Sequence, residues 1–352
     1  MNKNIKRIAF FLGSIMVLFV FQISYSEEID PYNSYQWHGR KGEDWYEWWY
    51  FKLIDPKTKT PFYFVYGVVN PWDISQKKES SRAMVSIGDF SNHTMMTQNF
   101  SPKSFSASRE RPLVSIGEYN LATDQKIEGF IFQNGYYARW NLKIKKIRGW
   151  QAMGWGMPLK VFNIWWYPAQ MDATFSGTIE MNGKVYEIED ADGYQDRNWG
   201  TSFPKWWYWM VSNSFVENEN SSLASGGGSA ATQYGLPLPT AVLIGLYHED
   251  KMYSFRSSDI GNYIDYDIKM GSWNITAIQP NYKIELQASC DLDELMDLEF
   301  ITPGGQVFHD YETLTGTLSV KLYERSFFRW KEIASLSSID TAGLELGLDR
   351  EL

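Results

Sequence analysis

The chain has 352 residues, and its composition of 44% hydrophobic and 21% charged residues fits a folded protein with a sizeable core. The formal net charge is −9, and three of the 33 basic residues lie within the first seven positions, so the rest of the chain is more acidic still. An acidic surface repels a polyanion, which argues against DNA or RNA as a partner.

The first 26 residues have the pattern of a secretory signal peptide. Basic residues at positions 3, 6 and 7 precede an apolar run over residues 8–21, and small residues follow at Ser24 and Ser26. The run is shorter than the roughly 20 residues that span a bilayer, and an uncleaved membrane anchor is the alternative. We therefore expect residues 1–26 to lie outside the fold, and the mature protein to be periplasmic or peripheral to a membrane.

Short segments rich in aromatic and β-branched residues predict β-strands along the remaining chain. Asn-Gly dipeptides at residues 134–135 and 182–183 predict the tight turns of hairpins. Many short strands with frequent turn signals indicate an all-β fold, either a sandwich or a barrel. The expected strands are residues 47–54, 62–69, 84–90, 129–132, 136–144, 173–181, 184–188, 206–215, 240–247, 252–256, 263–268, 273–277, 282–289, 315–323 and 329–336.

Two irregular stretches indicate how the chain is divided. Residues 146–167 are rich in Gly, Trp and Pro and predict a crossing between domains, so we place a boundary near residue 170. The expected domains are an N-terminal β domain over residues 27–170 and a C-terminal β domain over residues 171–352. Residues 217–233 are polar and rich in Gly and Ser, which is typical of a flexible surface excursion.

A first candidate for chemistry lies in the aromatic segment 43–51. Because side chains alternate along a strand, Glu47 and Trp49 share one face, and Trp48 and Tyr50 share the other. A carboxyl group that faces a dry, aromatic interior has a raised pKa and can stay protonated at neutral pH. The alternative is that Glu47 lies at an edge in water and the aromatic residues form ordinary core.

A second candidate is the segment 190–204, which we predict to be a Gly-interrupted loop between strands. It brings Asp190, Asp192 and Asp196 together with Arg197 and Asn198. The Arg can hold one Asp ionised through paired hydrogen bonds, while a second, poorly solvated Asp carries a proton. The alternative is a structural ion pair and turn. The single Cys and four scattered His have no ligand spacing, so we expect no metal.

These motifs carry a resemblance to a known family. Residues 46–52 and 64–71, the block Tyr194–Gly200 with its continuation Phe203–Trp209, and the ending 341–347 resemble the tocopherol cyclase family in the right order. The first motif is also similar to carotenoid 1,2-hydratase-like proteins. The resemblance implies two lipocalin-like β-barrel or sandwich domains with an apolar pocket, and a cofactor-independent closure of a prenylated quinol to a chromanol.

That activity assigns roles to residues. We expect Asp196 or Asp192 to donate a proton to an alkene, with Glu47 as the other possibility. A secretory signal makes another prenyl quinol or isoprenoid lipid a better expected substrate than a tocopherol precursor, with peripheral membrane contact as a further expectation. The alternatives are an extracytoplasmic carrier of a hydrophobic isoprenoid and a hydratase of isoprenoid double bonds. The expected substrate-binding residues are Trp49, Tyr50, Tyr194, Arg197, Asn198, Trp199, Trp206, Trp207 and Trp209.

Overall fold

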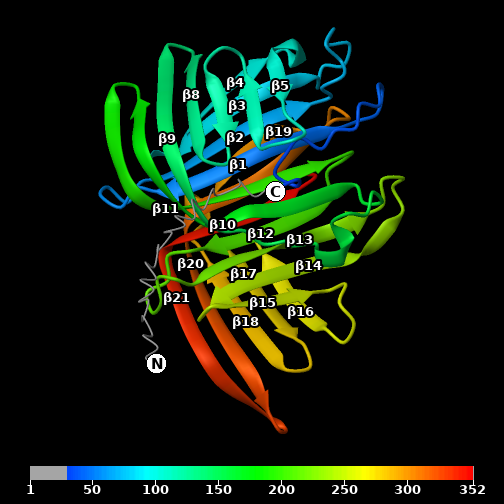
Figure 1. The fold of residues 1–352 in the computed structure, drawn as a ribbon, viewed down its shortest axis with the longest axis vertical. Coiled ribbons are helices and arrows are strands. Elements are labelled where there is room, and N and C mark those ends of the chain that lie inside the picture. The colour runs from blue at the N-terminus through cyan, green and yellow to red at the C-terminus, as the bar shows by residue number, and fades with distance from the viewer. Residues whose placement is uncertain (1–29, 352) are drawn as a thin grey trace, which may run out of the picture.

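The computed structural model describes residues 30–351, which form two large antiparallel β-sheets (Figure 1). The sheets follow one another along the long axis of the molecule, and the cyan and blue strands of the first lie above the yellow and red strands of the second. The signal peptide predicted for residues 1–26 lies outside the described residues. Over residues 30–351, none of the helices combines the length and apolarity needed to cross a bilayer.

The first sheet has 11 strands and curls into a nearly closed barrel. Two hydrogen bonds link β4 (Thr94–Phe100) to β8 (Lys126–Gln133), which are not paired in the sheet: Phe132 N donates to the side chain of Gln98, and Thr97 N donates to the side chain of Gln133. In order of pairing, the strands are β4 (Thr94–Phe100), β3 (Arg82–Asp89), β2 (Pro61–Val69), β1 (Tyr46–Ile54), β11 (Lys184–Gly200), β10 (Ile164–Met181), β9 (Tyr136–Arg148), β8 (Lys126–Gln133), β7 (Asn120–Thr123), β6 (Leu113–Ile116) and β5 (Phe105–Ala107).

The second sheet has 10 strands. In order of pairing they are β15 (Lys251–Arg256), β14 (Pro237–His248), β13 (Ser222–Ala231), β12 (Trp206–Ser212), β21 (Arg329–Leu348), β20 (Val307–Ser326), β18 (Tyr282–Ser289), β17 (Ser272–Ile278) and β16 (Tyr263–Lys269), with β19 (Met296–Ile301) also paired to β20. Short 3₁₀ turns interrupt the connections: η1 (Phe90–Asn92), η2 (Pro102–Ser104), η3 (Gly154–Gly156) and η4 (Leu292–Glu294).

Each sheet wraps its own apolar core, and a third core lies where the outer faces of the two sheets meet. Strand β1 belongs to both environments, because Trp49 and Phe51 enter the first barrel while Trp48 and Tyr50 enter the core between the sheets. All nine residues of β1 are buried as a result. The predicted division of this strand into two faces is confirmed, and its continuous aromatic run follows from burial on both sides.

The all-β prediction is confirmed, but two local interpretations were wrong. Residues 190–200 are part of β11 and not a loop, and residues 222–231 form strand β13, which is buried over its first half, and not a surface excursion. The chain changes sheet between Gly200 and Trp206, so the boundary predicted near residue 170 falls inside β10 of the first sheet. Residues 149–163 join β9 to β10 within that sheet.

The glycines of β13 explain why its composition was misleading. A Cβ atom on Gly226 would lie 3.0 Å from the Trp166 ring, and one on Gly227 would lie 2.0 Å from the carbonyl oxygen of Ala241. Glycine is therefore required at position 227 by the close approach of a neighbouring backbone, whereas a Cβ at position 226 would press on the Trp166 ring. The backbone of Gly226, Gly227 and Gly228 lines part of the candidate site.

Candidate active site

An apolar cavity of about 350 Å³ lies between the two sheets. Its walls come from β1, β2, β10 and β11 of the first sheet and from β12, β13, β14, β19, β20 and β21 of the second. Much of the surface is aromatic, and the glycines of β13 form one wall. The cavity is large enough for a small apolar ligand and lies where two rigid sheets hold its walls in place. The aromatic lining residues are Trp48, Tyr50, Tyr63, Trp155, Phe162, Trp166, Trp207, Tyr208, Trp209 and Phe300.

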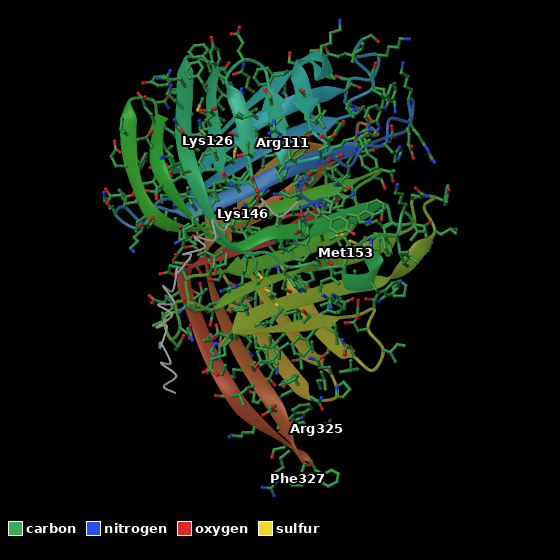
Figure 2. All side chains as sticks on the ribbon, viewed as in Figure 1. Arg111, Lys126, Lys146, Met153, Arg325 and Phe327 are labelled. Atoms are coloured by element: carbon green, nitrogen blue, oxygen red, sulfur yellow. The ribbon has the colours of Figure 1, made fainter. Side chains whose placement is uncertain are left out.

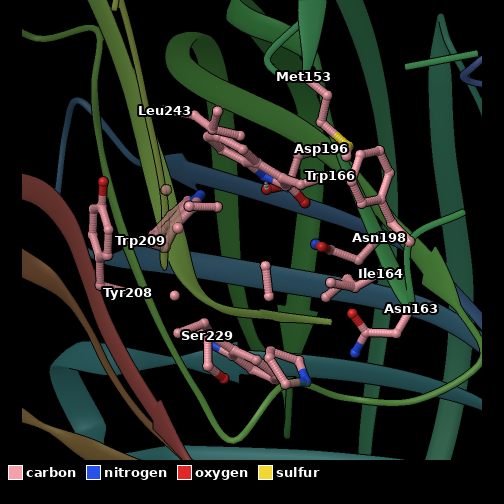
Figure 3. Close-up of a pocket in the computed structure, with 18 of the residues that line it drawn as sticks. Met153, Asn163, Ile164, Trp166, Asp196, Asn198, Tyr208, Trp209, Ser229 and Leu243 are labelled. Atoms are coloured by element: carbon pink, nitrogen blue, oxygen red, sulfur yellow. Dashed lines mark hydrogen bonds between the residues drawn. The ribbon is translucent and has the colours of Figure 1, made fainter. Parts of the chain in front are cut away.

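The carboxyl group of Asp196 lies in this wall, beside the indole of Trp166 (Figure 3). Its Oδ2 atom accepts hydrogen bonds from Trp166 Nε1 at 2.7 Å and from the Tyr194 hydroxyl at 3.0 Å. Trp209 Nε1 donates to the same hydroxyl at 3.4 Å. Burial raises the pKa of Asp196 from 3.8 to about 7, against the lowering effect of these donors. A substantial share of Asp196 is therefore neutral near pH 7.

Three further carboxyl groups line the cavity: the buried Asp310 and Glu312 on β20 and the partly buried Glu345 on β21. Glu312 and Glu345 are direct neighbours across the two strands. The Tyr50 hydroxyl donates to Glu312 Oε1 at 2.6 Å, and Trp207 Nε1 donates to Glu345 Oε1. Asp310 is hydrogen-bonded to Glu345 through one oxygen, whereas its Oδ1 atom has no hydrogen-bond partner among the described residues.

The electrostatics of the cavity favour neutral acids. Burial is the main cause that raises the pKa of Asp310, Glu312 and Glu345 well above the ordinary range, and the neighbouring carboxyl groups add to it. No Lys, Arg or His is among the described residues that line the cavity. The nearby Lys52 is buried, and desolvation lowers its pKa to about 8; it is still mostly charged near pH 7 and partly offsets the effect of burial on the pKa of Glu312.

Glu47 lies on the opposite face of β1, away from the cavity. Its Oε2 atom accepts from Arg197 Nη2 at 2.6 Å, and its Oε1 atom accepts from Trp45 Nε1 at 3.0 Å and from backbone N–H groups. Both members of the Glu47–Arg197 pair are fully buried, and the guanidinium of Arg197 lies over the Trp49 ring. Both carboxylate oxygens are thus occupied, and the pair joins β1 to β11 instead of facing a ligand.

Asp192 and Asp196 lie on the same face of β11, but Asp192 is exposed and Asp196 is buried. Asp192 is not among the residues that line the cavity. It accepts a hydrogen bond from the Ser214 hydroxyl at 2.8 Å. The structure therefore places one of the three predicted acids, Asp196, in the cavity wall. It does not bring Asp192 or Glu47 there.

The predicted substrate-binding residues divide in the same way. Tyr50, Asn198, Trp207 and Trp209 line the cavity, and Tyr194 lies behind them as a donor to Asp196. The others lie elsewhere: Trp49 enters the first core, Arg197 pairs with Glu47, Trp199 stacks on Trp165, and Trp206 packs against the second core.

Sequence reasoning missed Asp310, Glu312 and Glu345. A signal was present, because Asp310 and Glu312 alternate in a segment that otherwise has the pattern of a half-buried strand, which places both on one face. Nothing in the sequence indicates that this face meets β1. Among residues 30–351, no group of three or more His, Cys, Asp or Glu side chains is arranged to hold a metal ion.

Comparison with known proteins places this geometry in context. The model of the tocopherol cyclase-like family matches residues 43–348. The chain is 26% identical to a probable chloroplastic tocopherol cyclase of Oryza sativa subsp. japonica, over 74% of this chain and 65% of that protein. It is 22% identical to a chloroplastic tocopherol cyclase of Zea mays, over 90% of this chain and 77% of that protein. The match thus spans a little less than two thirds of the rice relative.

Solved structures share the fold at low sequence identity. Kievitone hydratase from Nectria haematococca matches with a TM-score of 0.52 and 11% identity, over 86% of this chain and 88% of that chain. CghA, in a crystal structure with Sch210972, matches with a TM-score of 0.50 and 12% identity, over 88% of this chain and 90% of that chain. These likenesses bear on the arrangement of the two sheets alone.

Proposed function

Because the chain belongs to the tocopherol cyclase-like family, we propose that it closes a prenylated quinol to a chromanol by protonating an alkene, without an external cofactor. The observation that carries the proposal is the cavity, in which three buried carboxyl groups and the partly buried Glu345 meet an aromatic wall and no basic side chain among the described residues. Such a site keeps acids protonated, and a protonated acid is what addition to an unactivated alkene requires.

Asp196 is the proposed proton donor. Its Oδ2 atom already accepts two hydrogen bonds, so the proton of the neutral acid belongs on Oδ1. A pKa of about 7 lies near the working pH, where a general acid is both protonated and ready to give up its proton. Trp166 and Tyr194 then stabilise the carboxylate that forms, because both donate to the oxygen that keeps the charge.

The proton goes to the less substituted alkene carbon, and a tertiary carbocation develops on its neighbour. Aromatic side chains in the wall, among them Trp48, Trp207 and Trp209, can stabilise this cation by about 2 kcal/mol or more when water is excluded. The phenolic oxygen attacks the cation, and its proton returns to the Asp196 carboxylate. The reaction is an isomerisation, so atoms and charge balance without a co-reactant.

Positioning is the other contribution of the cavity. A flexible prenyl chain must fold so that the phenolic oxygen and the alkene meet, and holding reactants in place can be worth several kcal/mol. The hydroxyl of Tyr50 and the carboxyl of Glu312 form a polar pair, 2.6 Å apart, in the otherwise apolar wall. We propose that this pair, with Glu345, orients the quinol hydroxyl groups while the prenyl chain lies against the aromatic side chains.

Incubation of the purified chain with a prenylated benzoquinol tests the proposal. We expect a chromanol of unchanged mass, identified by its ultraviolet spectrum. Asp196→Asn should abolish turnover, and Asp192→Asn, on the same strand but exposed, should leave it unchanged. A product that has gained one water would identify a hydratase instead. Quinol recovered unchanged, with tight binding, would identify a carrier.

A further inference from the structure

Exposed apolar side chains gather on three loops beside the cavity. The loops connect β9 to β10, β13 to β14, and β15 to β16, and each contributes lining residues to the cavity or lies next to one. We call the exposed set the rim; it consists of Trp155, Leu159, Val161, Tyr234, Leu236 and Ile260. Exposed apolar residues scattered singly are ordinary, but a group of this size around one opening marks an interaction surface.

The three loops are joined to one another, so the rim is one surface. Phe162 and Thr232 form an isolated β-bridge, and Gln233 N donates to the Val161 carbonyl at 2.9 Å. Arg256 Nε, at the end of β15, donates to the Ala152 carbonyl at 2.6 Å. Figure 2 shows Met153 on this flank of the molecule, at the level where the two sheets meet.

The rim is continuous with the cavity. Trp155 lines the cavity and is nevertheless 61% exposed, so its indole belongs to both the interior wall and the outer surface. An apolar molecule that leaves the cavity along this indole passes directly from the aromatic wall to the apolar rim. The opening therefore suits a ligand that arrives from an apolar phase.

The charge of this region differs from that of the chain. Residues 151–163, 201–205 and 229–241 contain Lys160 and Lys205 and no Asp or Glu, in a chain of net charge −9. The acid nearest in sequence to Ile260 is Asp259, and it is paired with Arg256 at 3.5 Å. Apolar side chains with lysines beside them complement an anionic lipid surface, because the rings and aliphatic groups enter the headgroup region while the lysines meet phosphate.

We propose that the rim docks on an anionic lipid bilayer, and that the lipophilic substrate passes from the bilayer into the cavity between these loops. The identity of the substrate in this inference rests on the proposed function, whereas docking of the rim on a bilayer does not. Docking itself requires no turnover, so the two claims fail separately.

The molecule provides a control surface at the far end of the second sheet. Phe327 and Phe328, at the tip of the β20–β21 hairpin, are also fully or almost fully exposed, and Figure 2 shows Phe327 well away from Met153. That tip lies apart from the cavity, and charged residues of both signs flank it: Glu324 and Arg325 on β20, and Arg329, Lys331 and Glu332 on β21. The tip matches the rim in exposed aromatic character and in having basic side chains beside it, but it is not continuous with the cavity.

A polarity-sensitive dye on a single cysteine distinguishes the two surfaces. In the full chain with Cys290→Ser, the dye is attached to Tyr234→Cys in one variant and to Phe327→Cys in the other. Vesicles of phosphatidylcholine with phosphatidylglycerol should shift the emission of the first to the blue and leave the second unchanged. A shift at position 327 alone, or at neither position, overturns the proposal. So does a shift at position 234 that depends on protein concentration without vesicles, since it identifies a second copy as the occupant.

Affinity measurements supply the second arm. Lys160→Gln should weaken binding to the anionic vesicles about fivefold, since a lysine at such a surface is worth about 1 kcal/mol. The double variant Trp155→Ser with Leu236→Ser should weaken binding further, while Phe327→Ser with Phe328→Ser should not. Far-ultraviolet circular dichroism establishes that each variant is folded. Equal losses in the rim and tip variants, or none in either, would contradict docking through the rim.

Discussion

Replacing Asp196 by Asn should stabilise the protein at high pH while removing its activity. Burial raises the pKa of Asp196 from 3.8 to about 7, so the folded protein holds this proton over a pH range in which the unfolded chain has lost it. The free energy of unfolding of the wild type therefore falls as the pH rises from about 4 to about 7. Asn cannot ionise, and its side-chain oxygen can still accept from Trp166 and Tyr194.

The size of the effect follows from the pKa. One pKa unit corresponds to about 1.4 kcal/mol, so the rise from 3.8 to about 7 corresponds to about 4 kcal/mol. The Asp196→Asn variant should match the wild type near pH 4 and exceed its free energy of unfolding by about 4 kcal/mol above pH 7. The other buried acids are common to both chains, so most of their contribution cancels in the comparison.

Urea unfolding followed by tryptophan fluorescence, at a series of pH values from 4 to 8, measures the difference directly. Asp192→Asn is the matched control, because Asp192 lies on the same strand and is exposed. Its difference from the wild type should stay flat over the whole range. If the Asp196→Asn difference were also flat, burial would not hold Asp196 neutral, and the reasoning that makes it an acid would fail.

Three further outcomes are expected. Arg197→Met should lower the free energy of unfolding in urea by about 3–5 kcal/mol, because it leaves the Glu47 carboxylate buried and without a charged partner. Adding Glu47→Gln to that variant should restore part of the loss. Unaltered stability would contradict the structural role of the pair. Gly226→Val places methyl groups beside Trp166 in the cavity wall and should weaken binding of a prenyl quinone several-fold in a fluorescence titration. Equal affinity of the variant and the wild type would contradict the placement of the ligand in this cavity. Turnover should fall about tenfold for each pH unit above 7 as Asp196 ionises, and a flat profile to pH 9 would argue against a carboxylic acid donor.

The strand content could be predicted because aromatic and β-branched segments favour strands wherever they occur. Strand β1 is an example: its run from Glu47 to Ile54 predicted both the strand and the division of its faces. Strand β13 could not be predicted, because its glycines allow Trp166 to lie close to the strand and line the cavity, and both features depend on the tertiary structure. Composition alone makes such a segment indistinguishable from a linker.

The candidate site shows the same limit. The acid–Arg–Asn–Trp segment correctly drew attention to Asp196, but sequence parity puts Asp192 and Asp196 on the same face and cannot tell that one end of that face is exposed. Glu312 and Glu345 come from the other sheet, more than 100 positions away from Asp196 in the chain. Their convergence depends on how the outer faces of two sheets pack, which no local pattern encodes.

Turnover of a prenylated benzoquinol in D₂O, with the product analysed by mass spectrometry, tests the central claim most directly. A carboxylic acid that exchanges with solvent and protonates the alkene should leave one deuterium on carbon in the chromanol. The wild type and Asp192→Asn should give this product, and Asp196→Asn should give none. A chromanol without carbon-bound deuterium, or normal turnover by Asp196→Asn, would contradict protonation by Asp196 in the cavity between the sheets.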